Sequence, residues 1–357
     1  MFKSWAKIRN PKRLMEGIYR PLQNDAYIYT MNKIVGVASG GFTSEYGISK
    51  KSGQVIYDLI KESPYEVYQI NARLDQWTVS DQQENNYPLD LSTFSFQKAG
   101  ESFSFDYVVN MIHGAPGENG ELASILEQLH IPHSSCDSDQ AALTYSKRDC
   151  LVAANKIGVP TAKRFILNQG EHYSIDAIEA AVGLPCFVKA NRAGSSFGVY
   201  KIYAKNDLDS AIEKAFEEDH EILIETALEG REITVGVVHY KGVIKVLPLT
   251  EIVTENEFFD YKAKYEGQSE EITPAKLPKA WEEKIIATAK HLYDKLELKG
   301  ITRSEFIFQN DLPHLLEINT IPGMTHQSII PQQAQAAGIP LKELILDLIK
   351  TGLAKKM

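Results

Sequence analysis

The sequence lacks the features that mark several classes of protein. It has three cysteines, Cys136, Cys150 and Cys186, which are odd in number and do not have the spacing of metal ligands. This pattern argues against a disulfide framework or a zinc site and favours reduced thiols in the core of a cytoplasmic protein. No apolar run approaches the roughly 20 residues that a membrane-spanning helix needs. We therefore expect no membrane insertion.

Positive charge is also scarce. The formal net charge is −9 at pH 7, with 38 Lys and Arg against 47 Asp and Glu. Proteins that bind nucleic acids hold phosphates on a basic surface, so this balance argues against a nucleic-acid partner. Residues 1–30 are basic but lack the apolar segment of a signal peptide. We expect them to precede a domain that opens at Met31, either as a loosely held extension or as a basic arm that binds a surface.

The common phosphate-binding signatures are missing. Neither G-x-G-x-x-G nor G-x-x-x-x-G-K-[ST] occurs, which excludes a dinucleotide fingerprint and a Walker A loop. Lys189 instead closes an expected strand, 186–189, and is followed by the glycine- and serine-rich segment 191–198. A lysine beside such a loop places a positive charge and several backbone N–H groups around a phosphate. The sequence therefore predicts a phosphate pocket of a different kind.

The segment that organises the remaining predictions is His314–Thr325, HLLEINTIPGMT. It reads as a buried strand on which Glu317 and Asn319 point to one side, because strand side chains alternate between faces. The preceding strand, 301–308, carries Arg303 and Glu305 at the same spacing. On its own the E-x-N pattern fits a solvated edge strand as well as a Mg²⁺ site. The predicted hairpin, which gathers two carboxylates, an amide and a guanidinium on one face, favours a two-metal site for phosphoryl transfer.

The other elements predict a mixed α/β chain. Buried strands alternate with amphipathic helices up to about residue 135, as in βαβ units. Beyond that point we expect one helix from Gln140 to Ile157 that carries Lys147, then strands and helices up to a closing helix at 341–353. A polar loop from Phe258 to Pro274 is expected to be a functional lid, because long loops in compact domains usually are.

Several single residues allow two interpretations. Glu45 follows a strand and a Gly-Gly turn, where it either caps the next helix or binds an ammonium group; the cap is the interpretation that the residues favour. His113 follows another strand and either holds a carboxylate or only makes a hydrogen bond. Glu225 and Glu232 flank a turn and are either nucleotide acceptors or surface charges.

Taken together, seven segments resemble the D-alanine–D-alanine ligases of the ATP-grasp superfamily. The segments are GGFTSE, HGAPGENG, FVKANRAGSSFG, EGREIT, DYKAKY, ITPAKL and EINTIPGMT, in one order from Met31 onwards. The resemblance implies an ATP-grasp fold with an N-terminal βαβ domain at 31–135, a central domain at 136–229 and a C-terminal domain at 230–357. It implies ATP and two Mg²⁺ ions as cofactors, with Mn²⁺ as a substitute, and a homodimer.

The resemblance also implies roles for particular residues. For ATP these are Lys147, Lys189 and Lys264 at the phosphates, Ser196 and Phe197 in the phosphate loop, Glu225 and Leu228 at adenine, and Glu232 at ribose. For the metals they are Glu305, Glu317 and Asn319. For D-alanine they are Glu45 and His113 in the first subsite, and Arg303, Gly323 and Ser328 around the second subsite and the oxyanion. Ser195 and Tyr265 are implied to join the phosphate loop to the lid.

One departure from the family is visible, because Glu305 stands where an aspartate is usual. The implied reaction joins two D-alanines through an acyl phosphate, for peptidoglycan precursor synthesis. Alternatives are a ligase for D-lactate or D-serine on the same scaffold and a non-catalytic nucleotide-binding module. Tyr265 favours D-alanine over D-lactate, since a neutral phenol does not repel the incoming ammonium as an imidazolium would.

Overall fold

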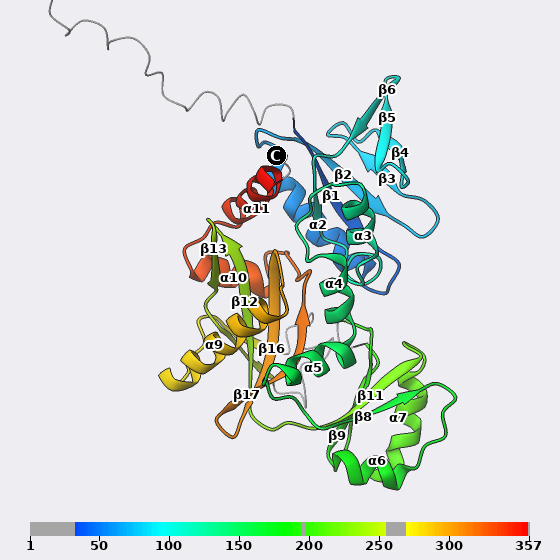
Figure 1. Cartoon of the computed structure of the whole chain (residues 1–357), viewed down its shortest axis with the longest axis vertical. Helices are drawn as coiled ribbons and strands as arrows, with labels where there is room; N and C mark the ends of the chain where they lie inside the picture. The colour runs from blue at the N-terminus through cyan, green and yellow to red at the C-terminus, as the bar shows by residue number, and fades with distance from the viewer. Residues whose placement is uncertain (1–32, 195–196, 255–268, 356–357) are drawn as a thin grey trace, which may run out of the picture.

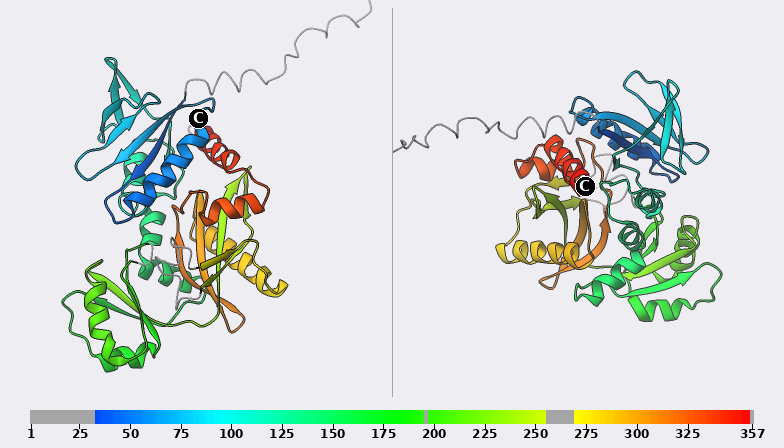
Figure 2. Two further views of the ribbon diagram at one scale, coloured as in Figure 1. Left: turned by 180° about the vertical axis from the view of Figure 1, so that it is seen from behind. Right: turned by 45° about the horizontal axis from the view of Figure 1, so that its top comes forward.

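The structure is a computed structural model that describes residues 33–194, 197–254 and 269–355. It contains three β-sheets, which Figures 1 and 2 show in chain order from blue to red. The predicted mixed α/β architecture is confirmed. Within the described residues, no helix is long and apolar enough to cross a membrane.

The first sheet has a parallel part and an antiparallel extension. Strand β1 lies between β2 and β7 and runs parallel to both, as expected for βαβ units. The antiparallel strands β3 to β6 extend the sheet beyond β2 and were not predicted, because they are short and polar. The strands are β1 Ile34–Gly40, β2 Glu66–Ala72, β3 Thr78–Ser80, β4 Asn86–Asp90, β5 Ser95–Lys98, β6 Glu101–Ser104 and β7 Tyr107–Asn110.

Helices cover both faces of this sheet. On one face α2 (Tyr46–Ile60) packs together with α11 (Leu341–Lys355), the last helix of the chain, and the two lie side by side in Figure 1. On the other face α3 (Glu121–Gln128) packs over a core rich in aromatic side chains. The strand expected near 131–134 is only a single bridge between Val108 and His133, because the chain turns away after one pairing.

The central sheet has four antiparallel strands in the order β10-β9-β11-β8. Apolar residues of helices α6 and α7 pack against those of the strands to form its hydrophobic core. Its elements are β8 Arg164–Asn168, α6 Ile175–Val182, β9 Cys186–Ala190, β10 Val199–Ile202, the 3₁₀ helix η1 Lys205–Asp207, α7 Leu208–Ala215 and β11 Glu221–Thr226. All three cysteines are buried free thiols, as predicted.

The helix expected from Gln140 to Ile157 is two helices, α4 (Ser138–Tyr145) and α5 (Lys147–Lys156). Ser146 interrupts the helix with an extended backbone, and its hydroxyl accepts a hydrogen bond from the N–H of Asp149. This is an N-cap, and it starts a new helix at Lys147. The interruption matters because it places Lys147 at a helix N-terminus.

The third sheet is antiparallel and has the order β15-β14-β12-β16-β17, with β13 paired to β12. Its core also takes the apolar residues of α4, α5 and α9. The segment Ser269–Ile272, which was expected to belong to the lid loop, is strand β15, because it pairs with β14. The elements are β12 Arg231–Tyr240, β13 Val243–Val246, β14 Thr250–Thr254, β15 Ser269–Ile272, α9 Lys279–Lys295, β16 Ile301–Gln309, β17 Leu312–Asn319 and α10 Ile329–Ala336.

Candidate active site

The predicted hairpin forms from β16 and β17, and it brings the four predicted polar residues onto one face. Arg303 lies opposite Asn319, and Glu305 lies opposite Glu317. The Arg303 guanidinium donates a hydrogen bond from Nη2 to Glu305 Oε1 over 2.6 Å. A β-bulge follows Glu305 and shifts the register, so Phe306 pairs with Leu315. Bulges of this kind redirect side chains next to functional sites.

Lys147 connects this face to the phosphate loop. Its Nζ lies 3.1 Å from Glu317 Oε2 and donates a hydrogen bond to the carbonyl of Ala193 over 2.7 Å. Burial has the largest single effect and lowers the pKa of Lys147, but the carboxylates of Glu317, Glu45 and Glu305 together raise the pKa above its ordinary value. The ammonium group is therefore charged at neutral pH and available to an anionic ligand.

Lys189 and Glu225 form an ion pair across neighbouring strands of the central sheet. Lys189 Nζ donates to Glu225 Oε2 over 2.8 Å, and both side chains are largely buried. Removing one partner of a buried pair typically costs about 3–5 kcal/mol, because the other charge is left uncompensated. Among the described residues, the second oxygen, Glu225 Oε1, is buried without a hydrogen-bond donor. It is placed to accept a hydrogen bond from an N–H group of a ligand.

The prediction that the Glu45 side chain caps a helix is wrong. Glu45 occupies the N-cap position of α2, but its side chain makes no cap hydrogen bond. The carboxylate instead lies against Gly194 in the phosphate loop, where a Cβ on Gly194 would come within 2.6 Å of both carboxylate oxygens. The structure thus brings the first sheet's Gly-Gly turn and the loop after Lys189 together.

His113 is buried, and it connects the first sheet to the turn after β17. Its Nε2 lies 3.2 Å from Ser52 Oγ, which also accepts a hydrogen bond from the N–H of Met324. Burial lowers the pKa of His113 and favours the neutral imidazole. In the same turn, a Cβ on Gly323 would lie 2.8 Å from Ser328 Oγ, so these two predicted residues are neighbours.

Of the remaining predicted residues, three lie in the described part of the chain and four do not. Leu228 and Glu232 lie at the turn from β11 to β12, half-buried, with Glu232 on β12 between Ile252 and Ile307. Phe197 donates its backbone N–H to the carbonyl of Gly194 over 3.0 Å. Ser195, Ser196, Lys264 and Tyr265 lie outside the described residues.

Glu118 is a site residue that the sequence interpretation missed. Its Oε2 accepts a hydrogen bond from the N–H of Gly114 over 2.9 Å. Burial and, to a smaller extent, the nearby Glu45 carboxylate raise its pKa to about 8, against the lowering effect of the Gly114 N–H. The available signal was a carboxylate inside the glycine-rich segment HGAPGENG.

We expect the Glu118→Gln variant to be more stable than the wild type in the absence of ligands, by an amount that depends on pH. The folded protein holds the Glu118 proton up to about pH 8, while the unfolded chain releases it near its ordinary value of 4.5. The free energy of unfolding of the wild type therefore falls as the pH rises from 4.5 to about 8. The glutamine variant does not lose this stability, because its side chain has no proton to release. The melting temperatures should agree at pH 4 and differ by ~2 °C or more at pH 8. A difference that stays constant over this pH range would contradict the assignment.

A second cluster of polar side chains lies away from the hairpin. Glu127, His133 and Asp137 offer ligand atoms within 4.8 Å of one another beside a cavity of about 660 Å³. Glu127 accepts hydrogen bonds from the N–H and hydroxyl of Ser138 over 2.7 Å each, and Asp137 pairs with Lys299. Because both carboxylates already have partners, we assign no metal to this cluster.

The fold and the hairpin site define a class of protein. The hairpin of one antiparallel sheet and the loop that follows β9 of the other meet through Lys147, and the turn after β1 of the first sheet brings Glu45 to the same loop. This is the arrangement of an ATP-grasp enzyme.

Comparisons with known proteins identify the family within this class. Two family models match, the D-ala D-ala ligase N-terminus over residues 34–136 and the D-ala D-ala ligase C-terminus over residues 153–350. The chain is 47% identical over 322 residues to a D-alanine–D-alanine ligase of Flavobacterium johnsoniae. The match covers 90% of this chain and 100% of the relative. The chain therefore belongs to the D-alanine–D-alanine ligase family.

Solved structures agree with this assignment. The D-alanyl-alanine synthetase A of Vibrio cholerae has a TM-score of 0.82 at 27% identity, covering 91% of this chain and 99% of its own. The VanG D-Ala:D-Ser ligase of Enterococcus faecalis has a TM-score of 0.79 at 28% identity, covering 89% and 99%. A D-alanine–D-alanine ligase of Bacillus anthracis in complex with ATP has a TM-score of 0.73 at 27% identity, covering 91% and 98%.

Proposed function

We propose that this protein joins two molecules of D-alanine into D-alanyl-D-alanine, using ATP, for peptidoglycan precursor synthesis. The observation that carries the proposal is the hairpin face with Glu305 opposite Glu317 and Arg303 opposite Asn319. A non-catalytic nucleotide-binding module would not need Arg303 and both carboxylates on one face.

ATP is held between the central and third sheets in this proposal. Lys147, Lys189 and Lys264 bind the phosphates, and the backbone around Ser195, Ser196 and Phe197 adds N–H donors. Glu225 and Leu228 contact adenine, and Glu232 contacts the ribose. The buried Glu225 Oε1 supports this placement, because the amino group of adenine is the kind of donor that it lacks among the described residues.

The hairpin residues suit Mg²⁺ by their chemistry. Glu305, Glu317 and Asn319 offer oxygen atoms, the donors that Mg²⁺ prefers, and Mn²⁺ accepts the same set. Asn319 Oδ1 already accepts the N–H of Ile321 over 2.9 Å, which fixes its orientation and leaves a lone pair. When bound, two such ions neutralise the charge that develops on the transferred phosphoryl group. The longer Glu305 side chain reaches one methylene further than the usual aspartate.

In the first step, the carboxylate of one D-alanine attacks the γ-phosphorus of ATP. The bond from the γ-phosphorus to the β–γ bridging oxygen breaks, and ADP leaves an acyl phosphate behind. Glu45 holds the substrate ammonium, and His113 lies near the carboxylate. Lys189 and Lys264 neutralise the negative charge on the phosphoryl oxygens, which is the main task of a phosphoryl-transfer site.

In the second step, the amine of the second D-alanine attacks the acyl carbon and phosphate leaves. Arg303 and the N–H of Gly323 stabilise the oxyanion, and Ser328 binds near the second carboxylate. Such donors act strongly because they are oriented before the reaction begins. Ser195 and Tyr265 join the phosphate loop to the lid, which must keep water from the acyl phosphate.

The product can be tested by competition. The enzyme is incubated at pH 7.5 with ATP, Mg²⁺ and equimolar D-alanine, D-lactate and D-serine, and the products are identified by mass. We expect D-alanyl-D-alanine to predominate, because a neutral Tyr265 does not repel the second ammonium. Predominance of the ester or of D-alanyl-D-serine would assign the chain to one of the alternative ligases. Without any D-alanine-dependent release of phosphate, the ligase proposal fails.

Three further points belong to the same proposal. The domains extend over 31–135, 136–229 and 230–357, preceded by the basic extension 1–30. The protein forms a homodimer and works in the cytoplasm, where D-alanine and ATP are available.

A further inference from the structure

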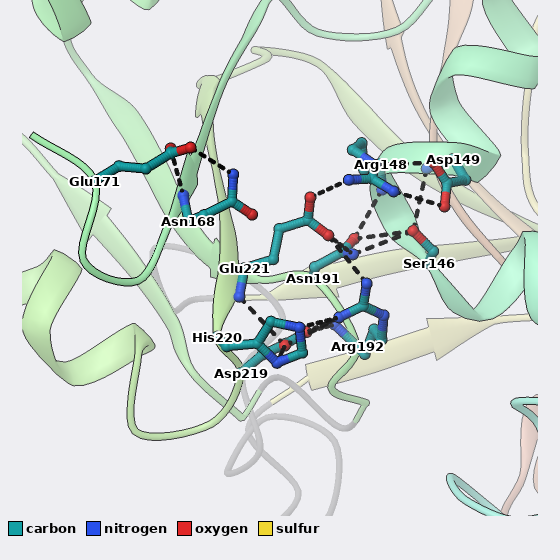
Figure 3. A network of polar contacts seen from close by, with 10 residues as sticks. All are labelled: Ser146, Arg148, Asp149, Asn168, Glu171, Asn191, Arg192, Asp219, His220 and Glu221. Carbon is teal, nitrogen blue, oxygen red and sulfur yellow. Dashed lines mark hydrogen bonds and ion pairs between the residues drawn. The ribbon is translucent and has the colours of Figure 1, made fainter. Parts of the chain in front are cut away.

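A network of polar side chains lies behind the two phosphate lysines, and none of its members was among the predicted site residues. It consists of Arg148, Asn191, Arg192, Asp219 and Glu221, which we call the Glu221 cluster (Figure 3). These residues come from the N-terminus of α5, the segment after β9 and the start of β11. Three separate parts of the chain thus meet at one point.

Glu221 is the centre of this cluster. Its side chain is only 2% exposed, and it forms ion pairs with Arg148 and Arg192. Arg148 Nη1 donates to Oε1, while Asn191 Nδ2 and Arg192 Nη2 donate to Oε2 over 2.8 and 3.1 Å. A buried carboxylate with this many charged and polar donors is fully compensated and held in one orientation.

The cluster fixes the backbone on both sides of the phosphate site. Arg148 is next to Lys147, and its N–H donates to Asn191 Oδ1 over 2.9 Å. The N–H of Lys147 points to the carbonyl of Asn191 over 3.3 Å, and Asn191 itself donates its N–H to the carbonyl of Glu221 over 3.0 Å. Lys189 lies two residues before Asn191 and pairs with Leu223, two residues after Glu221. Both lysines are therefore within two residues of the cluster.

Apolar packing joins these two parts of the chain only weakly. The buried residues of α5 belong to the core of the third sheet, whereas α6 and α7 fill the core of the central sheet. Leu223 is the one buried residue of the central sheet's four strands that belongs to the core with α5. Polar contacts therefore connect the N-terminus of α5 to the strand that carries Lys189. Asn191 makes the direct hydrogen bonds to Ser146, Lys147 and Arg148, and Glu221 joins the Arg148 side chain to those of Asn191 and Arg192.

We propose that Glu221 is a positioning residue for ATP, which sets the separation of the Lys147 and Lys189 ammonium groups by tying α5 to the segment after β9. This inference rests on the proposed function only in naming ATP as the ligand. Point charges act on phosphates with a strength that depends on distance, so a loosened cluster weakens phosphate binding first. The D-alanine subsites, built from the first and third sheets, are not connected through Glu221.

The test compares Glu221→Gln with Glu171→Gln. Glu171 is a matched control, because it is an exposed carboxylate of the central domain that accepts hydrogen bonds from Asn168 but contacts neither arginine (Figure 3). We expect Glu221→Gln to raise the KM for ATP about tenfold, as outer-shell changes do, with the KM for D-alanine within twofold of the wild type. Calorimetry without D-alanine should show the same loss of ATP affinity. Glu171→Gln should change neither quantity.

A second variant separates positioning from folding. Glu221→Gln should lower the melting temperature, because Arg148 then keeps only Asp149 as an acidic partner. Glu221→Gln/Arg148→Gln also removes this guanidinium, so the melting temperature should recover towards the wild type. The KM for ATP should remain raised, because the side-chain connection from Arg148 through Glu221 to Asn191 and Arg192 is still missing. If the glutamine variants do not fold, Arg148→Lys can be used instead, because lysine keeps the positive charge but not the planar guanidinium. It should also raise the KM for ATP.

Specific results would overturn the inference. One is an ATP affinity within twofold of the wild type in a folded Glu221 or Arg148 variant, and another is an equal rise in KM for both substrates. A third is a double variant in which both the KM for ATP and the melting temperature return to the wild-type values. Glu221 would then stabilise the fold without positioning the lysines. If the wild type binds ATP but does not join D-alanine, the proposed function fails, while the affinity measurements still test Glu221.

Discussion

Replacing Glu317 with glutamine is expected to reduce turnover at least ~100-fold without unfolding the protein. Glu317 lies opposite Glu305 and 3.1 Å from the Lys147 ammonium, so it is the carboxylate that faces both the hairpin partner and the phosphate lysine. Glutamine has nearly the same shape but no charge, and it cannot bridge two cations as a carboxylate does. The measurement is kcat at saturating ATP and Mg²⁺, with the melting temperature measured alongside.

Two comparisons make this result specific. Glu343→Gln also removes a carboxylate that pairs with a lysine, Lys241, but on the surface, and should leave kcat unchanged. Glu305→Asp should keep activity and change only the dependence on Mg²⁺, because it restores the usual residue. Near-normal turnover of Glu317→Gln at saturating Mg²⁺ would eliminate the two-metal site. Inactivity of Glu305→Asp would contradict the hairpin geometry.

The Arg303→Lys variant is expected to lose turnover by about 10²–10³-fold with a normal KM for ATP. Arg303 is held by its hydrogen bond to Glu305 Oε1. In the proposed mechanism, its guanidinium presents donors in a fixed plane to the oxyanion. Lysine keeps the charge but not this geometry, so the acyl phosphate should form and react slowly. Rapid-quench measurement of ADP should then show a burst in the first turnover.

The control for this variant is Arg73→Lys. Arg73 also lies near a carboxylate, Asp75, but both side chains are mostly exposed, so the change should have no kinetic effect. A loss in Arg303→Lys that appears only as a raised KM for ATP would assign Arg303 to the nucleotide. Burst kinetics with a slow second step support its place at the oxyanion.

The parts of the site that follow from local pattern could be predicted from the sequence. The alternation in β16 and β17 places Arg303, Glu305, Glu317 and Asn319 on one face whatever the rest of the fold does. The position of Lys189 near the end of β9 could be predicted because a short apolar run there is followed by a segment rich in glycine and serine. Such predictions need only the geometry of one strand and its neighbour.

The parts that depend on contacts between distant segments could not be predicted. Glu45 precedes a helix in the sequence, as a capping residue does. Its carboxylate instead lies against Gly194, which is far away along the chain. Ser146 interrupts a continuous helical pattern, because its hydroxyl caps a new helix. Glu221 lies in the sequence just before an expected strand, 222–225, and only the folded chain surrounds it with Arg148 and Arg192.

The packing of α11 on the first sheet has a consequence for synthesis on the ribosome. Val35 and Ile56, near the start of the described chain, share a core with Leu344 and Ile349 near its end. At translation rates of about 5–20 residues per second, the first strands wait for tens of seconds before this helix leaves the exit tunnel. During that time an apolar face of the nascent sheet is open to solvent, so newly made chains need protection from aggregation until α11 has packed against it.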